Sequence, residues 1–275
     1  MKKLLLAFML TIFPCLNAQI TDNSDGTSAT GSYSVAMGYN TTASGDQSTA
    51  MGRSSTASGA RSTAMGYNTT ASGINSTAIG RKSVASGYYS TTLGYDTRAS
   101  DFTSTVIGQY NNSLSSITTN GSATSYDADN TAFVIGNGTD DSNRSDAFKV
   151  MFNGDATVSN DLTVSGDVVI SSDARLKSNI VSLGRTLAKI LQIDGKSYTM
   201  KKDESEKQKI GLLAQDIEKV FPDLVSESNG IKSVNYQGLV PVLINALKEQ
   251  DNRISNQQIE IDELRNMLKA LIEKP

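Results

Sequence analysis

Residues 32–45 have the sequence SYSVAMGYNTTASG, and this stretch returns with small changes every fourteen residues. Further copies begin at residues 46, 60, 74 and 88, and a shorter copy begins at residue 102. Most copies keep a serine, a small residue, a larger apolar residue and a glycine at fixed positions, followed by Ala-Ser-Gly. Such constant spacing is typical of stacked structural repeats. The composition would also fit a disordered Ser/Thr/Gly-rich linker, but a linker has no reason to keep the register.

Each repeat is expected to form two short strands joined by two tight turns. Glycine follows both apolar steps, and glycine supplies the positive φ of a tight turn without steric cost. Stacking aligns one set of larger apolar side chains, called here the apolar row: Met37, Met51, Met65, Ile79, Leu93 and Ile107. At about 4.8 Å per coil, a stack of six coils would extend roughly 29 Å. One such coil buries little surface, so we expect the repeats of several chains to associate laterally.

These repeats resemble the head of trimeric autotransporter adhesins. The resemblance rests on the recurring Ser-x-Ala-x-Gly and Ala-Ser-Gly positions and covers about residues 24–110. In that family each repeat is one coil of a left-handed parallel β-roll, and three chains associate. The resemblance therefore implies a mainly β N-terminal half, with residues 19–110 as the β-roll of a homotrimer. It also implies adhesion to a surface or matrix ligand, which the sequence does not identify.

One position of the repeat alternates between tyrosine and arginine. The residue after the repeat glycine is, in successive copies, Tyr39, Arg53, Tyr67, Arg81 and Tyr95. Such a row is either a binding stripe or the ordinary decoration of a solvated face, and the sequence favours the second interpretation.

The first eighteen residues have the features of a secretory signal peptide: two lysines, an apolar run and a small residue at position 18. The run is shorter than the ~20 residues of a transmembrane helix, so no transmembrane anchor is expected. Lipidation of Cys15 is an alternative, although Pro14 stands where a small residue is expected. The sequence predicts a secreted or cell-surface protein.

The chain lacks the residues of several common catalytic and metal sites. It has no histidine, and its one cysteine lies inside the predicted signal peptide. Disulfides, thiolate catalysis, Ser-His-Asp triads and His-bound zinc are therefore not expected, nor is any cofactor. The net charge of −3 gives no basic excess for binding nucleic acid. A nucleophile would need a different base, for which lysine is the main candidate.

Residues 111–171 contain short β-prone runs separated by Gly, Asn and Asp. Two of these runs are residues 133–135 and 147–152. The pattern predicts a β-rich connector. It also resembles the shaft segments of phage tail fibres and spikes.

Beyond residue 171 the composition changes, and every glutamate of the chain lies after residue 200. Residues 172–240 contain strand-like segments around Tyr198 and at residues 230–236, with an amphipathic helical segment that ends before Pro222. This mixture predicts a compact α+β module.

A long helix is expected from about Pro241, so residues 241–275 form the last predicted segment. Two series of residues recur there every seven positions: Val240, Leu247, Ile254, Ile261 and Leu268, and Leu243, Gln250, Gln257, Leu264 and Leu271. This is the a/d pattern of a coiled coil. Isoleucine at a with leucine at d favours parallel dimers, so only the resemblance of the repeats makes a trimer preferred. The alternative is a helix packed onto its own domain.

The stretch ISSDARLKSNI, residues 170–180, lies where the two halves meet. In the simplest interpretation Ser172 is a helix N-cap and Asp173 is favoured by the helix dipole. Ser172 and Lys177 are five residues apart, so on a regular helix or strand they point in different directions. They can meet only if the chain bends between them. Arg175 lies close enough in sequence either to repel the lysine ammonium or to have a structural role.

Three blocks of the C-terminal half, SDARLKSNI, GLLAQDIEKVFPDLV and VNYQGLVPVLINALKEQ, resemble the intramolecular chaperone autoprotease of endosialidase tail spikes. The resemblance covers residues 172–250. It implies that Ser172 is the nucleophile and Lys177 the base of a Ser-Lys dyad. It also implies that the bond between Ser171 and Ser172 is cut once, after the chain has folded as a trimer.

Two rival interpretations remain at the level of sequence. In one, the C-terminal module is a permanent trimerisation clamp and Ser172 is inert. In the other, the chain is a membrane-anchored transcription factor, because eukaryotic relatives use this autoprotease in that way. The lack of a basic DNA-binding region and of a transmembrane helix makes the second interpretation the weaker one.

Overall fold

The computed structural model describes residues 20–21, 26–112, 121–201, 206–228 and 230–273. The predicted signal peptide, residues 1–18, lies outside the described residues. The chain divides into two compact units, one ending at Val168 and one beginning at Val169. Within the described ranges, no helix is both long and apolar enough to cross a membrane.

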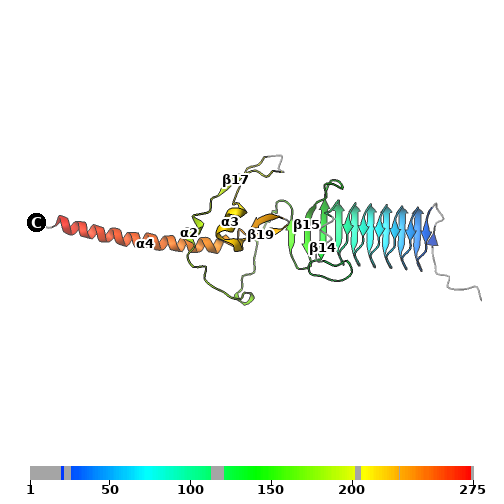
Figure 1. Cartoon of the computed structure of the whole chain (residues 1–275), viewed down its shortest axis with the longest axis horizontal. Coiled ribbons are helices and arrows are strands. Elements are labelled where there is room, and N and C mark those ends of the chain that lie inside the picture. The colour runs from blue at the N-terminus through cyan, green and yellow to red at the C-terminus, as the bar shows by residue number, and fades with distance from the viewer. Residues whose placement is uncertain (1–19, 22–25, 113–120, 202–205, 229, 274–275) are drawn as a thin grey trace, which may run out of the picture. The chain divides into compact units, whose positions relative to one another are not determined.

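The N-terminal unit is a parallel β-solenoid, visible in Figure 1 as a regular series of arrows. Its larger sheet contains β1 (Ile20–Thr21), β3 (Val35–Tyr39), β5 (Thr49–Arg53), β7 (Thr63–Tyr67), β9 (Thr77–Arg81), β11 (Thr91–Tyr95) and β13 (Thr105–Gln109). Its smaller sheet contains β2 (Ser28–Ala29), β4 (Thr42–Ala43), β6 (Thr56–Ala57), β8 (Thr70–Ala71), β10 (Val84–Ala85) and β12 (Arg98–Ala99). Each repeat thus supplies one strand to each sheet, which confirms the predicted coil of about fourteen residues.

The interior of the solenoid is built from small side chains. Two alanines of each typical repeat, such as Ala64 and Ala71, are fully buried and stack on the alanines of adjacent coils. The apolar row is in register, because Met37 pairs with Met51 and the later members follow the same alignment. Its side chains lie on the outer face, however, where Leu93 is 51% exposed. The residues of the apolar row therefore contribute outer surface rather than core.

The two glycine series differ in backbone conformation, although both lie close to the next coil: a Cβ placed on Gly66 would lie 1.9 Å from the carbonyl oxygen of Gly80. Gly66 and its equivalents have the predicted positive φ, but each lies within a strand, one residue before its end, rather than in a turn. The glycine of the Ala-Ser-Gly triplet does not, and the left-handed residue there is two positions later, for example Asn75 after Gly73. A Cβ placed on Gly73 would lie 2.1 Å from the carbonyl oxygen of Gly87. The expectation of positive φ was therefore wrong for this series, which needs glycine because adjacent coils approach each other closely.

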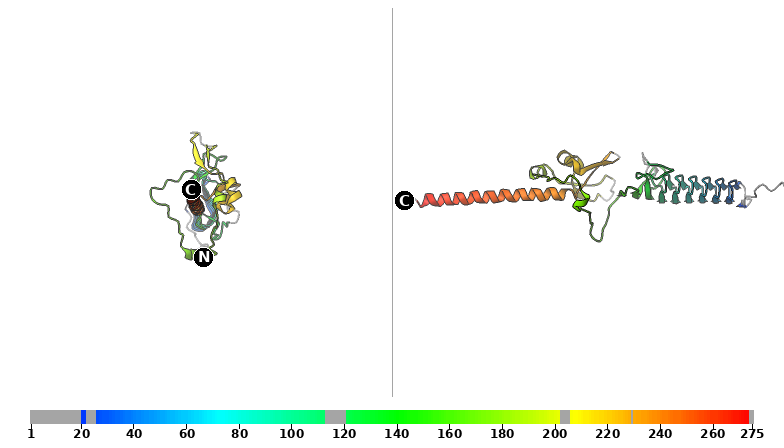
Figure 2. Two further views of the ribbon diagram at one scale, coloured as in Figure 1. Left: turned by 90° about the vertical axis from the view of Figure 1, so that its left-hand side faces the viewer. Right: turned by 90° about the horizontal axis from the view of Figure 1, so that it is seen from below.

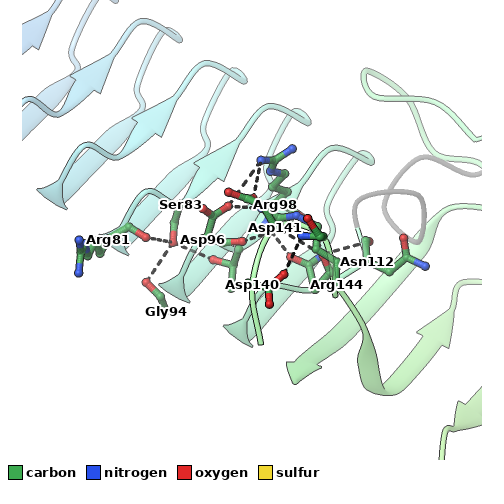
Figure 3. A network of polar contacts seen from close by, with 12 residues as sticks. Arg81, Ser83, Gly94, Asp96, Arg98, Asn112, Asp140, Asp141 and Arg144 are labelled. Atoms are coloured by element: carbon green, nitrogen blue, oxygen red, sulfur yellow. Dashed lines mark hydrogen bonds and ion pairs between the residues drawn. The ribbon is translucent and has the colours of Figure 1, made fainter. Parts of the chain in front are cut away.

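The parallel sheet continues past residue 110. Strand β14 (Thr131–Asn137) pairs with β13 in parallel, and the antiparallel strands β15 (Asp146–Met151) and β16 (Ala156–Val158) follow. A polar network joins β12 to the loop before β15 (Figure 3). In it, Arg144 donates to the buried carboxylate of Asp96. Arg144 Nη1 also donates to the carbonyl oxygen of Asp96, at 2.9 Å. Arg98 and Asp141 complete the network. The first part of the predicted connector thus belongs to the solenoid sheet.

The C-terminal unit is a small α+β module that ends in a long helix, as predicted. It contains two antiparallel hairpins, β17 (Lys196–Tyr198) with β18 (Lys209–Gly211) and β19 (Val225–Ser228) with β20 (Ile231–Val234). Its helices are the 3-10 turn η1 (Ala174–Leu176), α2 (Leu187–Ile190), α3 (Ala214–Val220), the 3-10 turn η2 (Pro222–Leu224) and α4 (Leu239–Ile272). Figure 2 shows α4 as one unbroken helix.

Candidate functional site

Ser172 and Lys177 lie side by side at the start of the C-terminal module. The ammonium nitrogen Nζ of Lys177 donates to Oγ of Ser172 at 2.7 Å. A single 3-10 turn, η1, stands between the two residues, so the chain bends where a regular helix or strand would have separated them. The required bend is therefore present.

The short turn is fixed by local hydrogen bonds. Asp173 caps η1, since its Oδ1 accepts from the backbone N–H of Arg175 at 2.8 Å. The backbone N–H groups of Leu176 and Lys177 donate to the carbonyl oxygens of Asp173 and Ala174, each at 3.1 Å. The capping role that sequence alone favoured for Ser172 is thus filled by the next residue, which leaves the Ser172 hydroxyl free to meet Lys177.

Arg175 has a structural partner. Its Nη2 lies 2.6 Å from Oδ2 of Asp173, and its Nε contacts the same carboxylate. The hydrogen bonds from Arg175 hold the pKa of the Asp173 carboxyl below its usual range. The guanidinium charge is therefore balanced within the turn, which favours the structural interpretation of Arg175 over repulsion of the lysine.

The dyad lies on the surface of the single chain. Ser171, Ser172 and Lys177 are all exposed. Two large apolar side chains close to them in sequence are exposed as well, Leu176 at 73% and Val181 at 81%. Single exposed apolar side chains are common on protein surfaces, so these two do not cover the serine and the lysine. Ser172 Oγ and Lys177 Nζ are therefore held together in a place that is open to water.

The segment after the dyad is anchored to helix α4. The carboxylate of Glu249 accepts from the backbone N–H groups of Thr186 and Leu187, the latter at 3.0 Å. These backbone hydrogen bonds lower the pKa of Glu249. The Thr186 hydroxyl donates to the carbonyl oxygen of Val242 at 2.7 Å, and Asn245 Nδ2 donates to the carbonyl oxygen of Gly184 at 3.2 Å. The segment that carries Lys177 is therefore hydrogen-bonded to α4 from Gly184 onward, seven residues after the lysine.

The residues of this anchor were not found by sequence reasoning. Glu249 and Thr186 are 63 positions apart. Glu249 lies in the third block of the chaperone resemblance, residues 234–250, but nothing in that block pointed to Thr186 as its partner. The only signal in the sequence is a threonine followed by a short apolar helix, which is a common N-cap pattern. Here the cap comes from a distant carboxylate, and the Thr186 side chain makes no cap hydrogen bond.

Helix α4 packs on its own module with one face and leaves the heptad face free. Leu239, Val242 and Ala246 are buried. The a/d positions are exposed, for example Ile254 at 53% and Ile261 at 43%. The alternative in which the heptad residues pack onto their own domain is therefore not what the described residues show.

The rest of the module has a small core. Ile217 of α3 is fully buried, and Lys232 of β20 reaches Glu218 of α3 at 2.6 Å and Glu227 of β19 at 3.0 Å. Tyr236 accepts from the backbone N–H of Leu212 at 2.8 Å. Several other large apolar side chains stay outside this core, including Ile210, Ile231 and Leu213. In the single chain, the core of the module therefore buries only part of its large apolar side chains.

Two family models match the chain, each over one part of it. Residues 172–226 match a peptidase family described as chaperone of endosialidase, and this match begins at Ser172. The YadA head domain repeat matches at residues 29–55, 43–69, 57–83 and 71–97. A comparison with curated proteins finds no match. Both predicted resemblances are confirmed: the chain combines YadA-type head repeats in its N-terminal unit with a chaperone-of-endosialidase segment in its C-terminal unit.

Proposed function

We propose that the chain is an adhesin-like fibre protein that assembles as a homotrimer, and that the module beginning at Ser172 assists folding and then cuts the bond between Ser171 and Ser172. The observation that carries this proposal is the 2.7 Å contact between Lys177 Nζ and Ser172 Oγ. It stands at the first residue of the segment that matches the chaperone family. The head repeats support the adhesive part of the proposal.

The chemistry requires only the groups of this chain. Lys177, in its neutral form, accepts the proton of the Ser172 hydroxyl while Oγ attacks the carbonyl carbon of Ser171. The C–N bond then breaks, Lys177 returns the proton to the released amine of Ser172, and an ester joins Ser171 to Oγ of Ser172. Water hydrolyses this ester and restores the hydroxyl. Because substrate and nucleophile belong to one chain, each chain reacts once.

Assembly supplies what the single chain lacks. A lysine acts as a base only when it is neutral, and removal from water lowers the pKa of a lysine. Copies of the chain that cover the exposed apolar residues near the dyad would exclude water from Lys177. The anchor at Glu249 ties the dyad segment to α4, whose a/d face is open for association. Cleavage would therefore follow association and mark a completed trimer.

A non-cleaving clamp is the second candidate. The exposure of Ser172 and Lys177 in the single chain favours the clamp. A lysine ammonium in water does not readily lose its proton, and a protonated lysine cannot act as a base. In that case the module would remain attached and hold three chains together through α4. The two candidates share the trimer and differ only at the bond between Ser171 and Ser172.

Mass spectrometry of the purified, folded protein separates the candidates. Self-cleavage predicts two fragments, of which the smaller begins with Ser172, and N-terminal sequencing of that fragment checks the position. A chain that stays intact after the trimer has formed, as judged by light scattering, supports the clamp instead.

A further inference from the structure

The alternating tyrosines and arginines of the solenoid form a continuous stacked ladder. The Arg53 guanidinium carbon lies 5.6 Å from the centre of the Tyr39 ring and 5.5 Å from that of Tyr67. Arg81 lies 5.6 Å from the Tyr67 ring centre and 5.0 Å from that of Tyr95. Each arginine thus stands between two aromatic rings at cation–π distance.

The backbone keeps the ladder in place. Each of these residues ends a strand of the larger sheet, and Tyr39, Arg53 and Tyr67 occupy equivalent register positions. Their carbonyl oxygens accept from amides fifteen residues later, for example Tyr67 from Lys82 at 2.8 Å. A ligand would therefore meet side chains that are already ordered, and such preorganisation lowers the conformational cost of binding.

The ladder presents unpaired positive charge to solvent. Arg53 and Arg81 are exposed, and neither forms an ion pair within the described part of the chain. Asp96, which follows Tyr95 in the chain, is buried and bound by Arg144. With aromatic rings on either side, each guanidinium offers its N–H edge, which matches a carboxylate or sulfate group in a bidentate manner. Tyr39 and Tyr67, exposed at 52% and 40%, add hydroxyl groups and ring edges between the charges.

The spacing of the charges selects the class of ligand. Adjacent coils are about 4.8 Å apart, so the two arginines repeat at about 9.6 Å along the stack, with a tyrosine midway. A nucleic-acid strand carries a phosphate about every 3.4 Å, which is too dense for this pattern. An extended polysaccharide with one acidic group per disaccharide has the matching order of a charged and an uncharged sugar.

We propose that this ladder binds a linear acidic polysaccharide with one carboxylate or sulfate per disaccharide, lying along the solenoid axis. The inference deepens the adhesive part of the proposed function and is independent of self-cleavage. Each anionic group pairs with an arginine, and the uncharged sugar between two anions packs against Tyr67. The interpretation of the row as simple surface decoration is the alternative to be tested.

The experiment measures binding of purified protein to two probes, hyaluronan and chondroitin oligosaccharides, at low and at physiological salt. Hyaluronan whose carboxyl groups have been reduced to alcohols serves as the matched neutral probe. We expect binding to at least one acidic probe, weakening with salt, and no binding to the neutral probe. Arg53→Gln and Arg81→Gln should each weaken binding roughly tenfold or more, since hydrogen bonds to charged groups contribute more than neutral ones.

Arg61→Gln is the control variant. Arg61 is an exposed arginine of the same repeats, but it lies outside the ladder and donates to Asn75 at 2.8 Å. It changes the net charge equally and should leave binding unchanged. Tyr67→Phe should retain most of the affinity, whereas Tyr67→Ala should lose it together with the stacking.

Four results would overturn the inference: no binding to either acidic probe, equal binding to the neutral probe, an equal loss with Arg61→Gln, or tighter binding of polyglutamate or single-stranded DNA. Light scattering is measured on every variant. If the ladder variants dissociate the oligomer, the ladder is an interface between copies of the chain rather than a ligand site. Mass spectrometry of the same samples reports self-cleavage separately. A failure of polysaccharide binding can therefore be told apart from a failure of self-cleavage.

Discussion

The two units of this chain bury their apolar residues in opposite ways. In the solenoid, the two stacked alanines of each typical coil are fully buried, and the larger apolar side chains of the apolar row lie on the outer face. In the C-terminal module, few side chains are buried, and large residues such as Ile210, Ile231 and Ile254 face solvent. A repeat closes its core against the next repeat of the same chain, whereas the module lacks such a neighbour. We therefore expect the module to depend more strongly on other copies of the chain than the solenoid does.

The largest effect is expected when charged residues are placed in the heptad seam, that is, at the a/d positions of α4. Ile254→Asp combined with Ile261→Asp places two carboxylates at a positions, where burial without a partner is costly. We expect complete loss of both the oligomer and the cleavage, while the circular dichroism of the solenoid persists. Light scattering and mass spectrometry of the same sample check both outcomes.

Ile259→Asp is the matched control for the seam. Ile259 is as exposed as Ile254 in the single chain, at 58% against 53%, but it falls outside the a/d series. We expect this variant to assemble and to be cut normally. A monomeric seam variant that is still cut would show that cleavage does not require assembly.

The second prediction separates the dyad from the assembly. Ser172→Ala removes the attacking oxygen, so we expect a trimer that stays uncut. Lys177→Arg keeps the positive charge but introduces a group that does not deprotonate at accessible pH, so cleavage should be lost here as well. The yield of the two fragments over time, measured by mass spectrometry, checks both variants.

The two dyad variants fail in distinguishable ways. Normal cutting of Lys177→Arg would reject lysine as the base and leave Ser172 as a candidate nucleophile. Normal cutting of Ser172→Ala would reject the self-cleavage proposal as a whole and favour the permanent clamp.

The solenoid offers the third test, because its close packing makes it sensitive to single atoms. Gly73→Ala would place a methyl group 2.1 Å from the carbonyl oxygen of Gly87, so adjacent coils would have to move apart. Overpacking of this kind typically lowers the free energy of unfolding by about 1–3 kcal/mol. Gly166→Ala is the control, since nothing lies within 4 Å of its added Cβ. Thermal unfolding followed by circular dichroism measures both variants, and equal stability would contradict the close-approach role of Gly73.

The coils could be predicted from sequence because the solenoid is held together by contacts between equivalent residues. A period of fourteen therefore fixes the strand pairs, such as Met51 with Met65. The sequence did not reveal that β14 continues the sheet. Val134-Ile135-Gly136 repeats Val106-Ile107-Gly108 after 28 residues, two repeat lengths, but the intervening residues lack the motif.

The site was less predictable than the coils, because its contacts are not periodic. The spacing of Ser172 and Lys177 argues against contact on any regular element, and only the family resemblance suggested that they act together. The 3-10 turn that joins them depends on the cap from Asp173, which is a local effect of one side chain. The anchor of Glu249 on Thr186 joins residues 63 positions apart, and no spacing in the sequence connects the two.

The smallest expected effect concerns this anchor and its dependence on pH. The backbone N–H groups of Leu187 and Thr186 lower the pKa of Glu249, because they stabilise its charged form. A carboxyl group with a lowered pKa stabilises the folded state fully above its unfolded pKa, and this contribution is lost as the pH falls through the folded value. We expect the amides of Thr186 and Leu187 to lose protection from hydrogen exchange below the usual range of a glutamate, while α3 stays protected. Glu249→Gln should remove the pH dependence without unfolding the module, since the amide oxygen still accepts a hydrogen bond. Protection that is already lost at neutral pH in the wild-type chain would mean that the dyad segment is not held on α4 by this carboxylate.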